Sequence, residues 1–186
     1  MKLKVFKREL IKKSESKRIR REGNIPAVVY SQGKETHPIL INGTEFSAAL
    51  RSIVPGRLAS TVFTLTDESG KEKRAIIKDI QYNITSYKVQ HLDFELLLAN
   101  VPISLNVPIE CVGAVDCIGV KLGGVLRLVI RQLRVRCLPK DIPSFFTIDV
   151  RSMGQNDAKR LSDLEIPKTV RPIANLNEVA VIIAKR

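Results

Sequence analysis

The sequence predicts a mostly β protein built from two domains with few helices. Short segments rich in Val, Ile, Leu and Thr recur along the chain, and turn-forming residues separate them. Helix-forming patterns thin out after residue 96, where prolines and glycines begin to punctuate the strands. We therefore expect a domain at 1–95 that combines strands with one or two helices, followed by a β-rich domain at 96–186. A chain of 186 residues is long enough for two modest cores.

The first domain is expected to open with a strand that has one basic face, because Leu3 and Val5 alternate with lysines. The further strands expected in this domain are 27–30, 39–41, 58–66, 73–81 and 88–96. β structure should therefore dominate the first half of the chain.

Two helices are expected between these strands. Ser14 or Ser16 is expected to cap a short helical turn that contains residues 17–21. Asn42 or Thr44 is expected to start a second, amphipathic helix for the same reason, since both side chains are favoured at helix N-termini.

The second domain is expected to be mostly β, with a helical turn within 157–164. The expected strands are 103–111, 125–138, 145–150 and a buried final strand at 179–184. The glycine-rich segment 119–124 lacks the GxxxxGK[ST] spacing of a phosphate-binding loop, so it is interpreted as a turn or a flexible loop.

The positive charge is concentrated at the start of the chain. The formal net charge is +12, and residues 1–34 alone hold 11 Lys or Arg against 3 Glu, for +8. Residues 35–95 carry −1 and residues 96–186 carry +5. Such concentration is typical of a site for a polyanion, although a solvated basic face is the plainer alternative.

Several other classes of protein are disfavoured. The longest apolar runs are far below the roughly 20 residues of a membrane-spanning helix, and the first residues lack the apolar segment of a signal peptide. Cys111, Cys117 and Cys137 form no CxxC motif, which favours three reduced thiols in a cytoplasmic protein. We expect no enzyme activity, no cofactor, no metal and no small-molecule substrate.

The basic helical turn is the first candidate site. Its cations surround most of its circumference and leave Ile19 to anchor it to the core. Arginine side chains suit phosphate oxygens and guanine edges. Tyr30 follows a short apolar strand and would stack on a base, donate its hydroxyl to a phosphate or ribose, or remain a half-buried strand residue. The candidates from this region are Arg8, Lys13, Ser16, Arg18, Arg20, Arg21 and Tyr30.

His91 and Asp93 form the second candidate site, because residues two apart on a strand share a face. The pair would serve as a catalytic base with its orienting carboxylate, as part of a metal site, as a plain exposed pair, or as readers of a nucleic acid. A carboxylate beside phosphates is unfavourable unless it accepts from base amino or imino groups, so base recognition is favoured. Gln81, at the end of the preceding strand, would read a base edge as well.

Arg134 and Arg136 share one face of a strand in the second domain, with Leu133 and Val135 on the other face. They form a second stripe that faces RNA or a partner, or else a solvated sheet surface.

Several motifs, in their order and spacing, resemble the bacterial ribosomal protein L25 family in its two-domain Ctc type. In the first half these motifs are Arg8, Lys13, the run Ser16 to Arg20, Gly23, the run Ile25 to Tyr30, and His91 to Phe94. In the second half they are Val107 to Ile109, Gly119 to Leu126, Cys137 to Pro143 and the Asp163-Leu164 step before Pro167. The resemblance covers nearly the whole chain.

The resemblance implies a six-stranded β-barrel-like N-terminal domain that binds the internal-loop region of 5S ribosomal RNA in the large ribosomal subunit. It also implies contacts to that RNA from positions matching Arg8, Arg20, Tyr30, His91 and Asp93, with support from Lys13, Ser16 and Gln81. The β-rich C-terminal domain is expected to contact other large-subunit components. The alternative it leaves open is a stress-related interaction protein that acts partly off the ribosome.

Overall fold

A computed structural model of the chain describes residues 1–8, 13–31 and 35–185, with the side chain of Lys13 outside the description. The chain divides into two compact units, Met1–Val101 and Pro102–Arg186. The domain boundary predicted near residue 96 falls at the last residue of a strand, shortly before the boundary between the two units.

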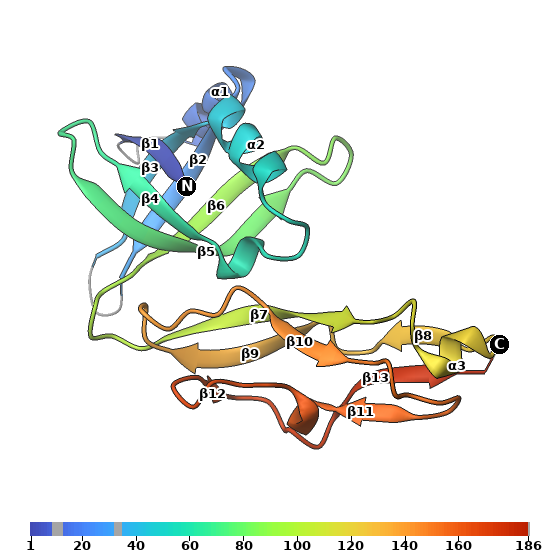
Figure 1. Cartoon of the computed structure of the whole chain (residues 1–186). Coiled ribbons are helices and arrows are strands. Elements are labelled where there is room, and N and C mark those ends of the chain that lie inside the picture. Colours follow the sequence, from blue (N-terminus) through green and yellow to red (C-terminus); the bar gives the residue numbers. More distant parts are fainter. Residues whose placement is uncertain (9–12, 32–34, 186) are drawn as a thin grey trace. The chain divides into compact units, whose positions relative to one another are not determined.

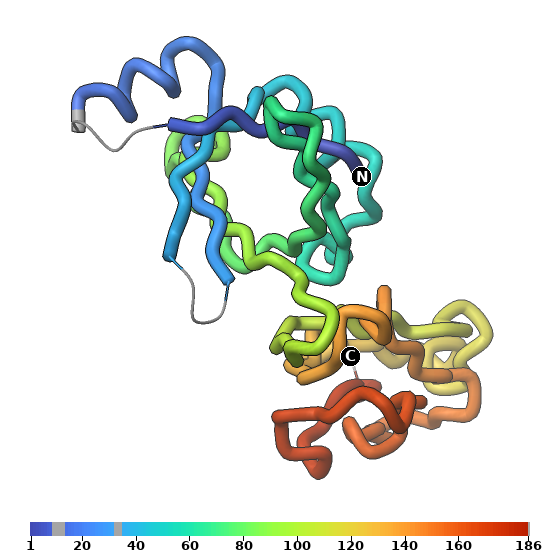
Figure 2. Tube along the Cα trace, turned by 90° about the vertical axis from the view of Figure 1, so that its left-hand side faces the viewer, coloured from blue at the N-terminus to red at the C-terminus, as the bar shows by residue number. Residues whose placement is uncertain are grey.

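The first unit is a closed barrel of six strands, as the resemblance implied. Figure 2 shows this barrel from one of its open ends. Neighbouring strands follow the order β1-β3-β2-β6-β5-β4, and parallel pairing of β1 with β4 closes the ring. Two helices and a short 3-10 helix complete the unit (Figure 1). The elements are β1 (Lys2–Lys7), α1 (Lys13–Arg21), β2 (Asn24–Tyr30), β3 (His37–Asn42), α2 (Gly43–Ser52), η1 (Leu58–Ser60), β4 (Val62–Thr66), β5 (Glu72–Tyr82) and β6 (Val89–Leu96).

The barrel interior is packed by side chains that alternate inward along the strands. Phe63 and Phe94 are fully buried, and their rings meet edge to face with centroids 6.1 Å apart. Leu3 and Val5 lie in this core, so the predicted alternation of β1 is confirmed. Since inward positions are filled by apolar groups, the polar residues between them lie on the outer wall.

Both predicted helices are present. Asn42 caps α2, because its side-chain oxygen accepts hydrogen bonds from the backbone N–H groups of Thr44 and Glu45. The predicted capping of α1 by Ser14 or Ser16 is wrong. The helix already begins at Lys13, so both serines have helical backbone within its first turns.

The end of α1 is fixed against the start of α2. Gly23 has φ +83°, a left-handed conformation that terminates the helix. Its carbonyl oxygen accepts a hydrogen bond of 3.1 Å from the Gly43 N–H, and a Cβ atom at Gly43 would overlap that oxygen. Ile19 is 5% exposed, which confirms the prediction that it anchors α1 to the core. The orientation of the cationic helix therefore depends on close backbone packing.

The second unit contains two sheets. One has the order β10-β7-β9-β12 and the other the order β11-β13-β8. Figure 1 shows both sheets and the short helix α3 beside β8. The elements are β7 (Ile103–Val112), α3 (Ile118–Lys121), β8 (Val125–Leu128), β9 (Gln132–Cys137), β10 (Phe146–Asp149), β11 (Ala158–Arg160), η2 (Leu161–Asp163), β12 (Arg171–Pro172) and β13 (Val179–Ala184).

Three predicted elements differ from the structure. The single strand expected at 125–138 is two strands, β8 and β9, which lie in different sheets. The N–H groups of Val129 and Ile130 both bond to the Ala180 carbonyl oxygen, and there the chain leaves the sheet of β8 and β13. Residues 58–60 form η1, so β4 begins only at Val62. The glycine-rich segment holds most of α3 and is not an open loop, since Gly119 is buried with no space for a side chain beside Gly154.

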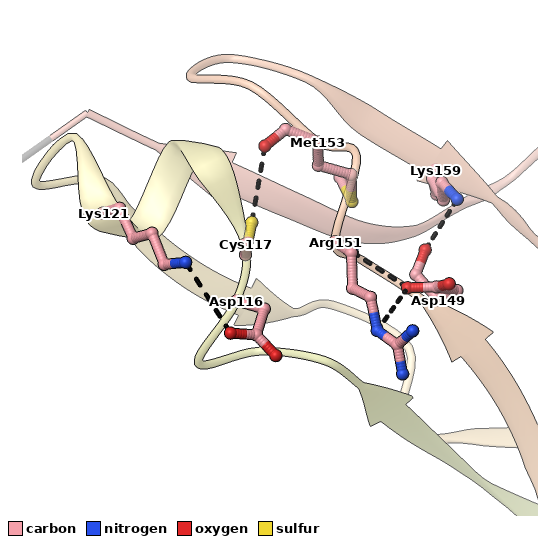
Figure 3. A network of polar contacts seen from close by, with 7 residues as sticks. All are labelled: Asp116, Cys117, Lys121, Asp149, Arg151, Met153 and Lys159. Atoms are coloured by element: carbon pink, nitrogen blue, oxygen red, sulfur yellow. Dashed lines mark hydrogen bonds and ion pairs between the residues drawn. The ribbon is translucent and has the colours of Figure 1, made fainter.

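Polar contacts join α3 to the segment after β10 (Figure 3). The buried Cys117 thiol donates to the Met153 carbonyl oxygen at 3.4 Å. Asp149 accepts from the Arg151 N–H through its side chain, while its carbonyl oxygen accepts from the Lys159 ammonium at 2.6 Å. The three cysteines are free thiols.

Candidate nucleic-acid interface

Pairing of β5 with β6 brings the predicted reader residues together on the outer wall of the barrel. Gln81 lies directly opposite His91, and Asp79 lies opposite Asp93. Leu92 and Phe94 point into the core with no exposed surface, so the residues between them face outward. The predicted common face of His91 and Asp93 is therefore present, and the pairing places Gln81 on it as well.

His91 and Asp93 are in contact. The His91 Nδ1 atom lies 2.7 Å from Asp93 Oδ1, and the two side chains are 19% and 31% exposed. The two atoms are close enough for an ion pair but are not aligned for a hydrogen bond, and Nδ1 is shielded from solvent. With Nδ1 turned toward the carboxylate, the ring presents Nε2 away from Asp93.

Arg20 connects the cationic helix to this strand. Its Nε donates a hydrogen bond of 3.1 Å to the carbonyl oxygen of Gln90, the residue before His91. The guanidinium is thereby held beside the start of β6. The predicted phosphate-binding group and the predicted base readers thus lie on adjoining elements of one surface.

Arg8 and Ser16 approach each other at the other end of α1. The Arg8 guanidinium donates to the Ser16 hydroxyl at 3.5 Å, the outer limit of a hydrogen bond, while the Arg8 N–H donates to the Pro38 carbonyl. Arg8 Nε is shielded from solvent and has no hydrogen-bond partner among the described residues. Arg8 is therefore half-buried and oriented by its surroundings.

The remaining cations of α1 differ in their surroundings. Arg18 lies 3.9 Å from Glu15 and 3.6 Å from Glu22, so its charge is partly balanced within the helix. Arg21 is exposed in the last turn. The Lys13 side chain, which is expected to support the contact to the RNA, lies outside the description.

Tyr30 ends β2 and pairs with Glu95, which follows Asp93 by two residues on β6. Partial burial raises the pKa of the Tyr30 hydroxyl above its ordinary value, and the charges of Glu95, Asp93 and Asp79 raise it further. The phenol therefore keeps its proton at neutral pH and is available as a hydrogen-bond donor.

Asp79 lies on the candidate interface, although the sequence pattern did not predict it there. Strict alternation from the buried Ala75 and Ile77 would turn Asp79 inward, but the pairing register shifts between Ile77 and Asp79. The extra residue at this bulge is Lys78, whose ammonium contacts Glu95 at 2.9 Å. Asp79 therefore lies outward, directly opposite a second carboxylate.

The structure offers no support for metal chemistry at His91. Within residues 1–8, 13–31 and 35–185, no three or more His, Cys, Asp or Glu side chains gather closely enough to hold a metal ion. Among the described helices, none is long and apolar enough to cross a membrane.

Arg134 and Arg136 alternate on β9 with the buried Leu133 and Val135, as the pattern predicts. Arg136 lies opposite Arg171 of β12, so three exposed arginines share one face of this sheet. That this face contacts RNA or a partner stays a prediction.

Comparison with known proteins assigns both units. Residues 3–94 match the model of the Ribosomal L25p family, and residues 102–186 match that of the ribosomal protein TL5 C-terminal domain. The chain is 52% identical to the large ribosomal subunit protein bL25 of Chlamydia trachomatis serovar L2. It is 51% identical to the bL25 proteins of Chlamydia abortus and Chlamydia pneumoniae, and each alignment covers all 186 residues and the whole relative.

The fold and the family matches together define a two-domain ribosomal protein, with a closed barrel that carries a cationic helix beside the His91–Asp93 strand and a β-rich unit after it. The chain belongs to the L25p family of ribosomal proteins, in its two-domain Ctc type. The proteins of this family are ribosomal structural proteins and not enzymes.

Proposed function

We propose that the chain is a structural constituent of the large ribosomal subunit and binds 5S ribosomal RNA through the outer face of its barrel. The printed names of its relatives support the first part. The observation that supports the second is the hydrogen bond from Arg20 to Gln90, which holds a cationic helix beside His91 and Asp93.

The arginines and the residues of the β5–β6 strands would contact different parts of the RNA. Arg8, Arg20 and Arg21 would contact phosphates, which supplies affinity that falls as salt rises. Gln81, His91 and Asp93 would read base edges where the RNA is widened or unpaired at its internal loop. The Tyr30 hydroxyl would donate to a phosphate, ribose or base acceptor.

The carboxylates favour this division. Asp79 and Asp93 repel a phosphate backbone and so weaken indiscriminate binding to RNA, whereas Glu95 is buried and paired with Lys78. Asp93 compensates for this repulsion only where a base presents an amino or imino donor to it. A surface that mixes arginines with outward carboxylates is therefore suited to one RNA shape rather than to any polyanion.

Ribosome association would place the chain in the cytoplasm, and the second unit would contact other components of the large subunit. Sedimentation of a cell extract tests this part. The chain should migrate with large subunits and ribosomes. If most of it migrated as free protein, the alternative of an interaction protein acting off the ribosome would be favoured.

Titration of the full chain against 5S ribosomal RNA and against a transfer RNA, at two salt concentrations, tests the RNA partner. We expect tight binding to 5S ribosomal RNA and weak, strongly salt-dependent binding to transfer RNA. Equal affinity for both at either salt concentration would contradict the proposal and leave only a nonspecific basic surface.

A further inference from the structure

The hairpin tip between β5 and β6, residues 83–88, exposes large apolar groups at the end of the candidate interface. Ile84 is 91% exposed and Tyr87 is 80% exposed, and Tyr82, the last residue of β5, is 46% exposed. Figure 1 shows this hairpin projecting from the barrel. Hairpin tips usually carry small polar residues, so these side chains need an explanation.

The tip is ordered by its own hydrogen bonds. The Asn83 side-chain oxygen accepts from the N–H groups of Thr85 and Ser86, at 2.9 and 3.0 Å. Asn83 also bonds through its backbone to Lys88 and Tyr87, at 2.8 and 2.9 Å. These hydrogen bonds fix the backbone from which Ile84 and Tyr87 project.

Tyr87 occupies a backbone conformation that disfavours it. Its φ is +53°, in the left-handed region that glycine and asparagine adopt most readily. Among the described residues, the other non-glycine position with positive φ holds an asparagine, Asn156. A tyrosine at position 87 strains the turn, and its exposed ring contributes little to packing within the barrel.

The tip follows closely after the predicted base readers on the same hairpin. Gln81 and His91 face each other on the outer wall, and after a register shift between Gln81 and Tyr82 the last pair before the tip is Tyr82 with Val89. Lys88 adds an exposed cation, and residues 83–88 hold no acidic side chain. Tyr87 and His91 are therefore only four residues apart on one hairpin.

We propose that Tyr87 is a stacking platform for an unpaired base of the RNA that binds the β5–β6 face, with Ile84 packing against the same nucleotide. This inference rests on the proposed function, since it adds a contact to the same surface. An aromatic face suits any base, and the neighbouring Lys88 attracts a phosphate beside it. The backbone of the tip is already ordered, so binding costs less conformational entropy, which gives the strained turn a use.

Two substitutions at this position in the full chain test the proposal. Tyr87→Asn removes the ring but suits the left-handed backbone, while Tyr87→Phe keeps the ring without the hydroxyl. We expect Tyr87→Asn to weaken binding to 5S ribosomal RNA about tenfold and Tyr87→Phe to stay within about twofold of the unchanged chain. The thermal midpoint of Tyr87→Asn should equal or exceed that of the unchanged chain, which excludes misfolding as the cause.

A fluorescent variant reports the contact directly. The chain contains no tryptophan, so Tyr87→Trp introduces a single reporter. Its emission should be quenched when 5S ribosomal RNA is added in stoichiometric amounts, and much less by the same amount of transfer RNA.

The outcomes separate the two proposals when His91→Ala is measured alongside. If His91→Ala loses affinity while Tyr87→Asn binds normally and Tyr87→Trp is not quenched, the stacking platform is refuted and the RNA partner stands. If His91→Ala also binds normally, both proposals fall. If Tyr87→Asn affects only incorporation into the subunit and not binding to the isolated RNA, the tip contacts another protein instead.

Discussion

The Arg20 guanidinium on α1 donates a hydrogen bond to the Gln90 carbonyl on β6, across 3.1 Å. This bond uses Nε, and the two terminal nitrogens have no hydrogen-bond partner within residues 1–8, 13–31 and 35–185. One arginine therefore fixes the helix beside the reader strand and still presents donors to a phosphate.

Arg20→Gln should weaken binding to every RNA and lower the dependence of log K on log salt by about one counterion, because one phosphate contact is lost. Titrations at several salt concentrations measure this slope. Arg127→Gln is the matched control, since it removes the same charge from an exposed arginine of the second unit that lies outside both candidate RNA surfaces. If the two variants had the same slope and affinity for 5S ribosomal RNA, binding would depend on total charge and not on the α1 surface.

Asp93→Ala should change the affinities for two RNAs in opposite directions. Loss of the carboxylate removes an acceptor for base donors, so affinity for 5S ribosomal RNA should fall several-fold. It also removes repulsion from phosphates, so affinity for transfer RNA should rise slightly. The ratio of the two dissociation constants is the measurement, and a parallel fall for both RNAs would show that Asp93 has only a structural role.

Asp79→Asn should stabilise the barrel. Asp79 and Asp93 lie directly opposite each other on antiparallel strands, and like charges in that position are destabilising by roughly 0.5 kcal/mol. The midpoint of urea unfolding should rise for Asp79→Asn and stay unchanged for Glu68→Gln, an exposed carboxylate in the β4–β5 turn. No rise for Asp79→Asn would mean that the two carboxylates do not repel each other in the folded chain.

The thiols should be unreactive in the native chain. Burial raises the pKa of Cys111 and Cys137 above the ordinary thiol value, and the charge of Asp141 raises that of Cys137 further. Cys117 is fully buried. Because the thiolate is the reactive form, a chromogenic disulfide reagent at neutral pH should react slowly before unfolding and with three thiols after it. A rapid reaction of the native chain would contradict this burial.

Much of the fold could be predicted from periodicity. Leu3 and Val5 are buried as their alternation indicates, and Asn42 caps α2 as its residue type favours. The split of 125–138 into two strands could not be predicted, because apolar residues continue through the segment and the break depends on hydrogen bonds to the distant Ala180.

Strand periodicity also predicts part of the candidate site, but it does not predict the bulge or the long-range contacts. The spacing of His91 and Asp93 places them on one face of any strand. The bulge at Lys78 reverses the faces of β5, so period-two counting assigns Asp79 to the wrong side. The contact between Arg20 and Gln90 joins residues 70 positions apart, and nothing in the local pattern of either segment encodes it.

The most direct test of the account compares His91→Ala with the unchanged full chain for discrimination between 5S ribosomal RNA and transfer RNA at one moderate salt concentration. The account predicts that the substitution weakens binding to 5S ribosomal RNA at least tenfold, leaves binding to transfer RNA unchanged and so removes most of the discrimination. Discrimination that survived His91→Ala at its original level would contradict the claim that this strand reads the RNA.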